Sequence, residues 1–291
     1  MSQLVLVTGA ESRVGAAAAL ACATAGHRVV ATMADPTQRG ELQKQAADRG
    51  VQVAFEQLDV TTRDVAEKVR ELGLKYGPVY ALVNAASEAV GCVFEEQTDA
   101  EVRLQFETNV IGLMAVTRAV LPMMRAAQRG RIVNVSGVAG RVGLPALAVF
   151  AATKHAVEGF SESLRWELEP FGIEVCVIEA GAIKAPIALD ADRRRSATGG
   201  NPAEVDVKPV AGPYRVLDEA IERLVRDGAD SAPSAEAVGK AIARVVAAPT
   251  PKFRTAVVGM DARTLVALRS MVPDRLFATG VRRALGLPRP R

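Results

Sequence analysis

The sequence predicts an α/β protein built on a doubly wound, parallel sheet of seven strands. Short apolar runs alternate with longer amphipathic stretches along most of the chain, which is typical of βαβ units whose sheet is covered on both faces. The composition agrees, because 49% of the 291 residues are hydrophobic and 24% are charged. Such a chain can form a large core, so a disordered or collagen-like protein is excluded.

Seven apolar runs are predicted to form the strands: Leu4 to Val7, Arg28 to Thr32, Val51 to Gln57, Tyr80 to Asn84, Arg131 to Ser136, Glu174 to Glu179 and Arg254 to Val258. Their short length and apolar character suit strands that are buried on both faces. Stretches with apolar residues at helical spacing are the predicted helices: Val14 to Ala25, Arg39 to Arg49, Arg63 to Tyr76, Glu101 to Ala127, Phe150 to Glu169, Val216 to Arg226 and Ala235 to Ala247.

These elements place residues 1–259 in a single domain. The stretch from Asp190 to Gly212 is rich in Arg, Gly and Pro and follows the sixth strand at the carboxyl edge of the sheet. Ligands of doubly wound folds bind at that edge, so we expect a helical lid over about residues 186–215. An ordinary disordered surface loop is the alternative.

The end of the chain is basic. Residues 251–291 contain nine Lys or Arg residues and two Asp residues, whereas the whole chain carries a net charge of only +3. Apolar residues recur there at helical spacing, so residues 260–291 are predicted to form a basic amphipathic extension that caps the domain. Contact with a membrane surface is a less favoured alternative, and we expect no nucleic-acid partner.

The cysteines and the apolar runs indicate the compartment. Cys22, Cys92 and Cys176 are far apart and odd in number, and neither a zinc site nor a disulfide scaffold has this pattern. No basic segment precedes the first apolar run, and no apolar run is long enough to span a membrane. We therefore expect a cytoplasmic protein with no metal site and no membrane span.

A glycine turn follows the first predicted strand, in the sequence Thr8-Gly9-Ala10-Glu11-Ser12-Arg13-Val14-Gly15. Such a turn lets backbone N–H groups and the positive end of a helix meet a pyrophosphate. Three more segments follow in order: Asn109-Val110-Ile111-Gly112, Ile132-Val133-Asn134-Val135-Ser136-Gly137 and Phe150-Ala151-Ala152-Thr153-Lys154. From residue 4 to about residue 185, the chain resembles the short-chain dehydrogenase/reductase superfamily and its Rossmann-like fold.

The resemblance implies hydride transfer between a nicotinamide and a carbonyl or alcohol carbon. In this family a tyrosine exchanges the proton, a serine polarises the carbonyl, a lysine binds the ribose and lowers the pKa of the tyrosine, and an asparagine holds a water molecule. The matching positions are Ser136, Lys154 and Asn109, which are the predicted catalytic residues, and the tyrosine position is occupied by Phe150. A phenyl ring has no O–H group, so it cannot act as a general acid or base.

The segments that would hold the cofactor also depart from the family pattern. Arg13 stands where a glycine lets the backbone approach the pyrophosphate, and Ala34 stands where relatives that use NADP often have an arginine. Asp35 is placed to hold the ribose of NAD, and Asp59 is placed beside adenine or caps the next helix. We interpret these residues as a vestigial cofactor site: Thr8, Gly9, Arg13, Gly15, Asp35, Asp59 and Asn84.

These departures predict a repurposed enzyme that uses no cofactor. It would catalyse a non-redox cyclisation, dehydration or isomerisation of an apolar carbonyl compound in secondary metabolism. The first alternative is a carbonyl reductase or alcohol dehydrogenase that depends on NAD or NADP, either active or an inactivated variant. The second is a non-catalytic subunit that keeps only the fold. Glu88 and Tyr214 are less favoured substitutes for the missing phenol.

Association into a homodimer or homotetramer is expected. The resemblance implies contact through the two long helices, Glu101 to Ala127 and Phe150 to Glu169. The second helix carries apolar residues at helical spacing, Val157, Phe160, Leu164 and Leu168, which we predict to be its contact face.

Overall fold

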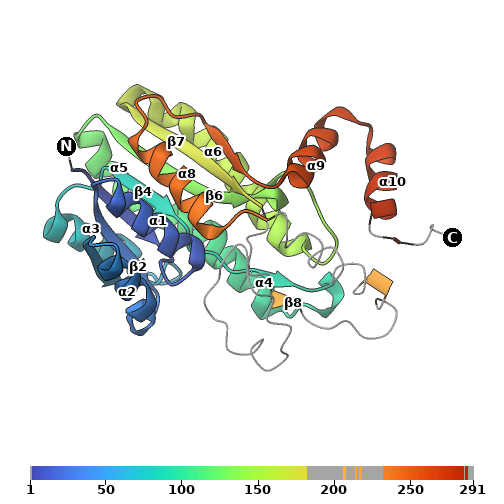
Figure 1. Cartoon of the computed structure of the whole chain (residues 1–291), viewed down its shortest axis with the longest axis horizontal. Coiled ribbons are helices and arrows are strands. Elements are labelled where there is room, and N and C mark those ends of the chain that lie inside the picture. The colour runs from blue at the N-terminus through green and yellow to red at the C-terminus, as the bar shows by residue number, and fades with distance from the viewer. Residues whose placement is uncertain are drawn as a thin grey trace.

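The predicted sheet is confirmed by the computed structural model, which describes residues 2–181, 206–207, 214, 216–217, 232–284 and 286–287. Seven parallel strands lie in the order β3-β2-β1-β4-β6-β7-β9 (Figure 1). The strands are β1 Leu4–Thr8, β2 Arg28–Met33, β3 Val53–Gln57, β4 Ala81–Asn84, β6 Gly130–Gly137, β7 Ile173–Ala180 and β9 Arg254–Val257. β1 and β4 are neighbours in the sheet but far apart in sequence, so the strand order reverses between them.

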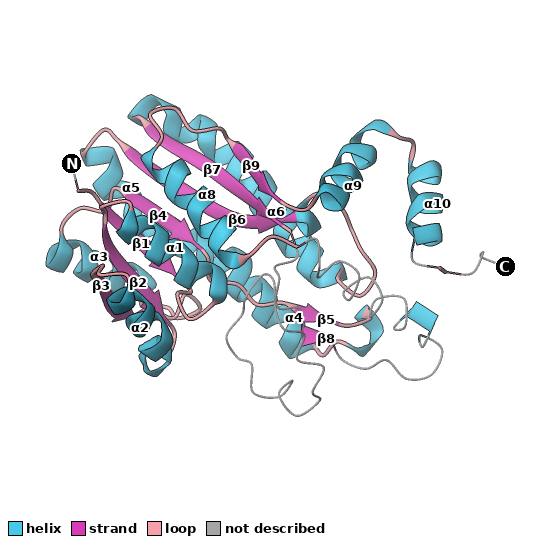
Figure 2. Cartoon of the chain, viewed as in Figure 1, coloured by secondary structure: helices cyan, strands magenta, loops and turns pink. Residues whose placement is uncertain are grey.

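Helices cover both faces of the sheet, as Figure 2 shows. One face carries α1 Arg13–Thr24, α2 Gly40–Asp48 and α8 Ala235–Ala247, and the other carries α3 Val65–Tyr76, α5 Leu113–Ala126 and α6 Ala148–Leu168. In β1, Val5 and Val7 belong to the first core, whereas Leu4 and Leu6 belong to the second. Successive side chains of a strand point to opposite faces, so a strand covered on both sides must be apolar throughout.

The predicted helix from Glu101 to Ala127 is interrupted. It consists of α4 Asp99–Phe106, a π-helical turn Glu107–Gly112, and α5. Thr98 caps α4 by accepting a hydrogen bond from the backbone N–H of Glu101 at 3.3 Å, which explains why the helix begins earlier than predicted. A π turn places one residue more per turn, and such turns are frequent at functional sites.

The predicted lid mostly lies outside the described residues. Two short strands, β5 Val90–Gly91 and β8 Asp206–Val207, pair in parallel as a separate sheet. Within the expected lid range, Tyr214 is also described, and of the predicted helix from Val216 to Arg226 only residues 216–217 are described.

The C-terminal extension forms two helices, α9 Met260–Met271 and α10 Asp274–Ala284, which project from the body of the protein (Figure 1). The prediction that they cap the domain is wrong, because α10 has no buried residue. Among the described helices, none is both long enough and apolar enough to cross a bilayer.

The apolar face of α6 and the three cysteines lie in the interior of the protein. Val157, Leu164 and Leu168 of α6 are buried within the chain itself, against the sheet, so the contact face predicted from their spacing is wrong. Apolar periodicity marks the buried face of a helix but does not say whether the sheet or a second subunit buries it. Cys22, Cys92 and Cys176 are buried and form no disulfide, in agreement with the sequence analysis.

Candidate functional site

Thr8 joins the ends of two neighbouring strands at the point where the strand order reverses. Its hydroxyl oxygen accepts hydrogen bonds from the backbone N–H groups of Ala85 at 3.2 Å and Ala86 at 3.3 Å. The carboxyl end of β1 is thereby held against the loop that follows β4. Ligands of open parallel sheets bind in the crevice at this position.

The glycine turn after β1 is shaped by two close backbone approaches. Gly9 has a φ of +65°, and a Cβ atom there would lie 2.4 Å from the Cα atom of Ala86. A Cβ atom on Gly15 would lie 2.1 Å from the carbonyl oxygen of Gly9. Ser12 caps α1 because its hydroxyl accepts from the N–H of Gly15 at 3.1 Å and donates to Gly9 O at 2.7 Å. The turn therefore places the N-terminus of α1 at the crevice.

Arg13 is the first residue of α1 and is partly exposed. Its position brings a guanidinium group to the positive end of a helix, beside the glycine turn. A dinucleotide pyrophosphate carries two negative charges, so a cation here attracts it unless the side chain fills its space.

Three carboxylates gather where β2 and β3 end. Glu11 accepts a hydrogen bond from the backbone N–H of Ala34 at 3.4 Å, and burial raises the pKa of Glu11, with Asp59 and Asp35 raising it further. Asp35 caps a short 3-10 helix by accepting from Thr37, which lowers the pKa of Asp35. Asp59 accepts from the N–H of Thr61 at 2.9 Å and from its hydroxyl at 2.7 Å, so it stabilises a local turn. The sequence analysis singled out Asp35 and Asp59 but missed Glu11.

Asn109 lies in the π-helical turn and holds two separate segments. Its Oδ1 accepts from the N–H of Glu88 at 2.6 Å, and its Nδ2 donates to Glu88 O at 2.7 Å and to the hydroxyl of Thr153 at 3.0 Å. The Thr153 hydroxyl donates in turn to Phe150 O at 2.7 Å. Asn109 is thus connected to the start of α6 through Thr153, a residue that the sequence analysis did not single out.

Phe150 and Lys154 lie together on α6, one helical turn apart. The Lys154 Nζ lies 5.4 Å from the centroid of the Phe150 ring and donates to Val135 O at 3.1 Å. Lys154 is only 2% exposed, and burial lowers its pKa to about 7, although Glu158 opposes the change. A protonated Lys154 is stabilised by the face of the ring, and its proton is exchangeable near neutral pH.

Ser136 takes no part in the contacts between Lys154 and Phe150. It is fully buried, and its Oγ has no hydrogen-bond partner among the described residues. A Cβ atom on Gly140 would lie 2.6 Å from this oxygen and 3.0 Å from Lys154 O, so Ser136 points beneath the backbone of α6. Its predicted role in polarising a carbonyl stays a prediction.

Asn84 occupies a structural position. Its Nδ2 donates to the Thr117 hydroxyl at 3.0 Å and to Asn134 Oδ1 at 2.8 Å, and Asn134 donates to the Ser161 hydroxyl at 2.8 Å. This buried chain fastens β4 and β6 to α5 and α6. The Nδ2 group of Asn84 is thus fully used, whereas its buried Oδ1 has no hydrogen-bond partner among the described residues.

The two substitutes for the missing phenol are placed differently. Glu88 is partly exposed, and its backbone N–H and C=O are both bound by Asn109, so this residue lies at the site. Tyr214 donates a hydrogen bond to Glu95, which raises the pKa of the Tyr214 phenol and occupies its hydroxyl. Tyr214 also packs with Cys92 and Val93, outside the Asn109 and Lys154 cluster.

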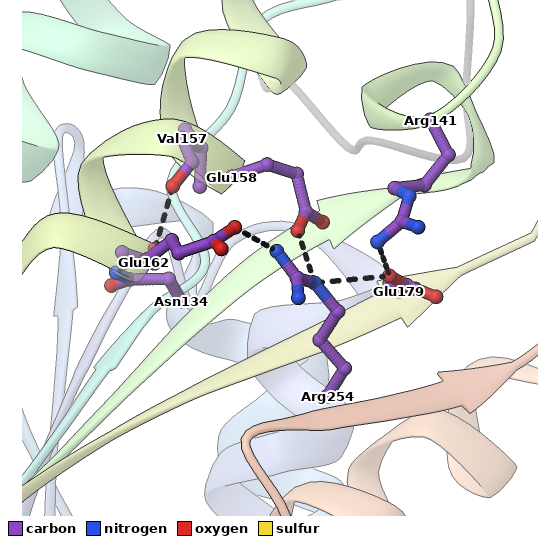
Figure 3. A network of polar contacts seen from close by, with 8 residues as sticks. Asn134, Arg141, Val157, Glu158, Glu162, Glu179 and Arg254 are labelled. Atoms are coloured by element: carbon purple, nitrogen blue, oxygen red, sulfur yellow. Dashed lines mark hydrogen bonds and ion pairs between the residues drawn. The ribbon is translucent and has the colours of Figure 1, made fainter. Parts of the chain in front are cut away.

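An ionic network surrounds Arg254, and its carboxylates range from the buried Glu158 to the exposed Glu162 (Figure 3). Arg254 on β9 donates to Glu158 at 3.0 Å and to Glu162 at 2.7 Å, and it lies 3.7 Å from Glu179. Arg141 pairs with Glu179 at 3.3 Å. Glu158 is one turn after Lys154 on α6, a spacing that sequence alone could have noted, but the partnership with Arg254 spans 96 residues and could not be read from it.

The residues present fit a nicotinamide dinucleotide. The turn at Gly9 and Gly15 is closed by backbone contacts rather than filled by side chains, and the Ser87 Oγ beside it is buried without a hydrogen-bond partner among the described residues. Carboxylates at the ends of β2 and β3 are acceptors for ribose hydroxyl groups. No cluster of metal-binding side chains occurs in the described part of the chain.

Comparison with known proteins gives consistent results. A family model described as short chain dehydrogenase matches residues 3–196. The uncharacterized oxidoreductase YusZ of Bacillus subtilis is 41% identical over 187 residues, which cover 64% of this chain and 66% of the relative. A 3-ketodihydrosphingosine reductase of Bacteroides thetaiotaomicron is 30% identical over 282 residues, 96% of this chain and 97% of the relative.

Solved structures agree with these relatives. A short-chain dehydrogenase from Streptomyces avermitilis superposes with a TM-score of 0.76 at 28% identity and covers 97% of both chains. A variant of the actinorhodin polyketide ketoreductase with NADPH has a TM-score of 0.72 at 27% identity, over 89% of this chain and 96% of that one.

These findings correct two expectations. The relatives are named oxidoreductases and reductases, and one of the similar structures holds NADPH, so the prediction of a cofactor-independent, non-redox enzyme is wrong. Arg13 and Phe150 depart from the family pattern, but the close backbone turn at Gly9 and Gly15 and the hydrogen bonds of Asn109 are present at the crevice.

The matched region contains the whole crevice, from Thr8 on β1 through Asn109 to Lys154 on α6. A relative with 30% identity extends the similarity over nearly the full length. The chain therefore belongs to the short-chain dehydrogenase family.

Proposed function

We propose that this protein is a nicotinamide-dependent oxidoreductase that interconverts a ketone and a secondary alcohol on a largely apolar molecule. One observation carries the proposal: a continuous path of contacts joins the glycine turn to the start of α6. Thr8 binds the backbone of Ala86, Asn109 binds Glu88 two residues further on, and Thr153 joins Asn109 to Phe150. The cofactor turn and the Lys154 ammonium are thereby held in one rigid unit.

The carboxylates favour NAD over NADP. A 2'-phosphate would lie near Glu11, Asp35 and Asp59, and the pKa of Glu11 is raised by burial and further by these two neighbouring carboxylates. The ribose hydroxyl groups of NAD are hydrogen-bond donors and suit these acceptors. We expect NADH to bind about tenfold more tightly than NADPH, and Glu11→Gln to reduce that difference.

Lys154 supplies the proton that a tyrosine would otherwise supply. Reduction of a ketone needs a hydride, which the nicotinamide supplies when bound, and a proton on the carbonyl oxygen. The Lys154 Nζ sits beside the Phe150 ring and has a pKa of about 7, so it holds a proton that it can release. The ammonium fraction falls above pH 7, and we expect the rate of reduction to fall with it.

The substrate class follows from the relatives and remains part of the proposal. The relative that matches nearly the whole chain is named a 3-ketodihydrosphingosine reductase. We propose an apolar ketone for this protein, in the cytoplasm. Association into a dimer or tetramer also stays a prediction, and light scattering checks it against the chain mass of 30.7 kDa.

A titration and an activity assay test the function. Fluorescence titration measures the affinity for NADH and NADPH, and loss of nicotinamide absorbance measures turnover of long-chain ketones, with a sugar ketone as the comparison. Binding of NADH with turnover that Lys154→Met abolishes is the expected result. Absence of binding by both nucleotides at millimolar concentration would contradict the proposal and leave a non-catalytic subunit.

A further inference from the structure

The corner between α9 and α10 exposes an unusual amount of apolar surface. Ten large hydrophobic side chains are exposed in the described residues, and three of them lie within residues 268–276: Leu268, Met271 and Leu276. Met271 is 80% exposed and Leu276 is 64% exposed. We call residues 268–276 the α9–α10 corner. Apolar side chains gathered at the tip of a projecting segment mark an interaction surface.

The two helices hold each other but bury little. The Arg269 guanidinium lies 5.4 Å from the centroid of the Phe277 ring and forms an ion pair with Asp274 at 2.8 Å. No residue of α10 is buried. In Figure 1 the pair extends away from the sheet, so the corner is presented to the surroundings rather than folded onto the domain.

The base of the extension is rigidly fixed. Arg254 on β9, six residues before the start of α9, is bound by Glu158 and Glu162 of α6 and lies near Glu179 of β7 (Figure 3). An anchored base lets the corner act as a fixed projection of the catalytic domain.

The positive charge of the extension indicates which kind of partner the α9–α10 corner contacts. Residues 259–291 contain seven arginines, no lysine and two aspartates, so the extension is strongly positive while the whole chain carries only +3. Guanidinium groups bind phosphate oxygens with two parallel hydrogen bonds. A second copy of the chain would bring like charges together, and the phosphates of a nucleic acid offer no apolar medium to Met271 and Leu276.

A second exposed apolar group provides a contrast. Phe94, Leu104 and Phe106 are also exposed, but their neighbours in sequence include Glu95, Glu96, Glu101 and Glu107. An anionic surface would repel that segment. Between these two groups, the α9–α10 corner is the one that combines exposed apolar side chains with surrounding cations.

We propose that the α9–α10 corner docks on a lipid bilayer that contains anionic phospholipids. Leu268, Met271 and Leu276 enter the boundary between headgroups and acyl chains, and Arg275, Arg282 and Arg283 contact the phosphates. The helices lie at the surface and do not span the bilayer. This inference does not depend on the proposed enzymatic activity, although surface docking would give the enzyme access to apolar ketones held in membranes.

Sedimentation of the full-length protein with lipid vesicles tests the proposal. The vesicles contain either phosphatidylcholine alone or phosphatidylcholine with about one third phosphatidylglycerol. We expect binding to the anionic vesicles that weakens as salt rises, and little binding to the neutral ones. Met271→Ser with Leu276→Ser should weaken binding about tenfold, and Arg275→Gln with Arg282→Gln and Arg283→Gln should do the same.

Matched variants separate this site from general effects. Leu74→Ser removes an equally exposed apolar side chain from α3, and Lys44→Gln with Arg125→Gln and Lys240→Gln removes the same net charge elsewhere. Both should bind like the wild type, and circular dichroism shows that every variant is folded. Equal binding by the corner variants, or no binding to anionic vesicles at low salt, would overturn the proposal. A larger mass that the Met271 and Leu276 changes reduce to that of one chain would show a self-association surface instead.

Discussion

Phe150 is held where a proton donor is needed, by its packing with Ala89, Ala139 and Ala151 and by the Thr153 hydroxyl on its carbonyl oxygen. Tyrosine has the same shape and adds an O–H next to a lysine that carries exchangeable charge near pH 7. Phe150→Tyr should therefore raise ketone turnover by about 10² or more, which is the usual contribution of general acid catalysis.

The measurement is loss of nicotinamide absorbance with saturating ketone, and the control is the NADH affinity, which this change should leave unaltered. Unchanged turnover with intact NADH binding would show that proton transfer does not limit the reaction. Phe150→Leu is the matched variant without a hydroxyl and should give no gain.

Arg13 decides how the pyrophosphate is received. If its guanidinium contacts the phosphates, Arg13→Ala should weaken NADH binding about tenfold, the usual loss for a hydrogen bond between charged groups. Isothermal titration gives the answer. Tighter binding by Arg13→Ala would show that the side chain obstructs the crevice.

Lys154 links folding stability to pH. Its pKa is about 7 in the folded protein and near the ordinary value of 10.5 in the unfolded chain. Between these values the unfolded chain binds more protons, so the free energy of unfolding should rise as pH rises from 7, by up to about 1.4 kcal/mol per pH unit from this group.

Urea unfolding at pH 7, 8 and 9 measures this slope. Lys154→Met keeps the approximate length of the side chain but cannot be protonated. Its free energy of unfolding should therefore rise less steeply with pH, by up to about 1.4 kcal/mol per pH unit, which corresponds to one proton. Equal slopes for the two proteins would show that Lys154 keeps its ordinary pKa in the fold.

At the scale of an element, α1 depends on glycines that no other residue can replace. A Cβ atom on Gly15 would lie 2.1 Å from a backbone oxygen, which cannot move without opening the turn. We expect Gly15→Ala to lower the free energy of unfolding by about 3 kcal/mol. Denaturant unfolding of each variant measures it.

Gly159 provides the matched control. It lies in the interior of α6 and is exposed, and a Cβ atom added to it would meet no atom within 4 Å. Gly159→Ala should raise the free energy of unfolding by about 1 kcal/mol through helix propensity. Equal effects of the two substitutions would refute the close packing at Gly15.

At the scale of the whole molecule, Arg254 joins the last strand to α6 and β7. Glu158 is 7% and Glu179 is 10% exposed at the side chain, so loss of Arg254 removes the ion-pair partner of the buried Glu158 and leaves Arg141 as the partner of Glu179. Arg254→Met should lower the free energy of unfolding by about 3 kcal/mol.

Arg49→Met tests whether the loss of stability expected for Arg254→Met depends on the burial of its ion pairs. Arg49 pairs with Glu236 at 3.3 Å, but both side chains are well exposed, so this change should cost less than about 1 kcal/mol. Thermal and urea unfolding of both variants give the comparison, and similar losses would contradict the importance of burial.

The sheet, the succession of its elements along the chain and the position of the crevice could be predicted from the amino-acid sequence. Apolar runs such as Leu4 to Val7, and the apolar periodicity of α3 and α8, indicate which residues are buried. Gly9 and Gly15 indicate a tight backbone turn. Burial and the turn can therefore be predicted without a structure. Asn109 and Lys154 were singled out for a different reason, because their positions match the pattern of the family that the chain resembles.

How those residues act together depends on contacts that form only in the folded protein. The lowered pKa of Lys154 arises from burial, and its contacts with Val135 and the Phe150 ring require strands and helices to be assembled. The gathering of Glu11 with Asp35 and Asp59, the closure of Arg254 on Glu158, and the exposure of α10 depend equally on segments far apart in the chain. The periodicity of apolar residues shows that one face of a helix is apolar. The electrostatic energy of a side chain and its exposure to solvent depend instead on which other groups lie near it in the folded protein.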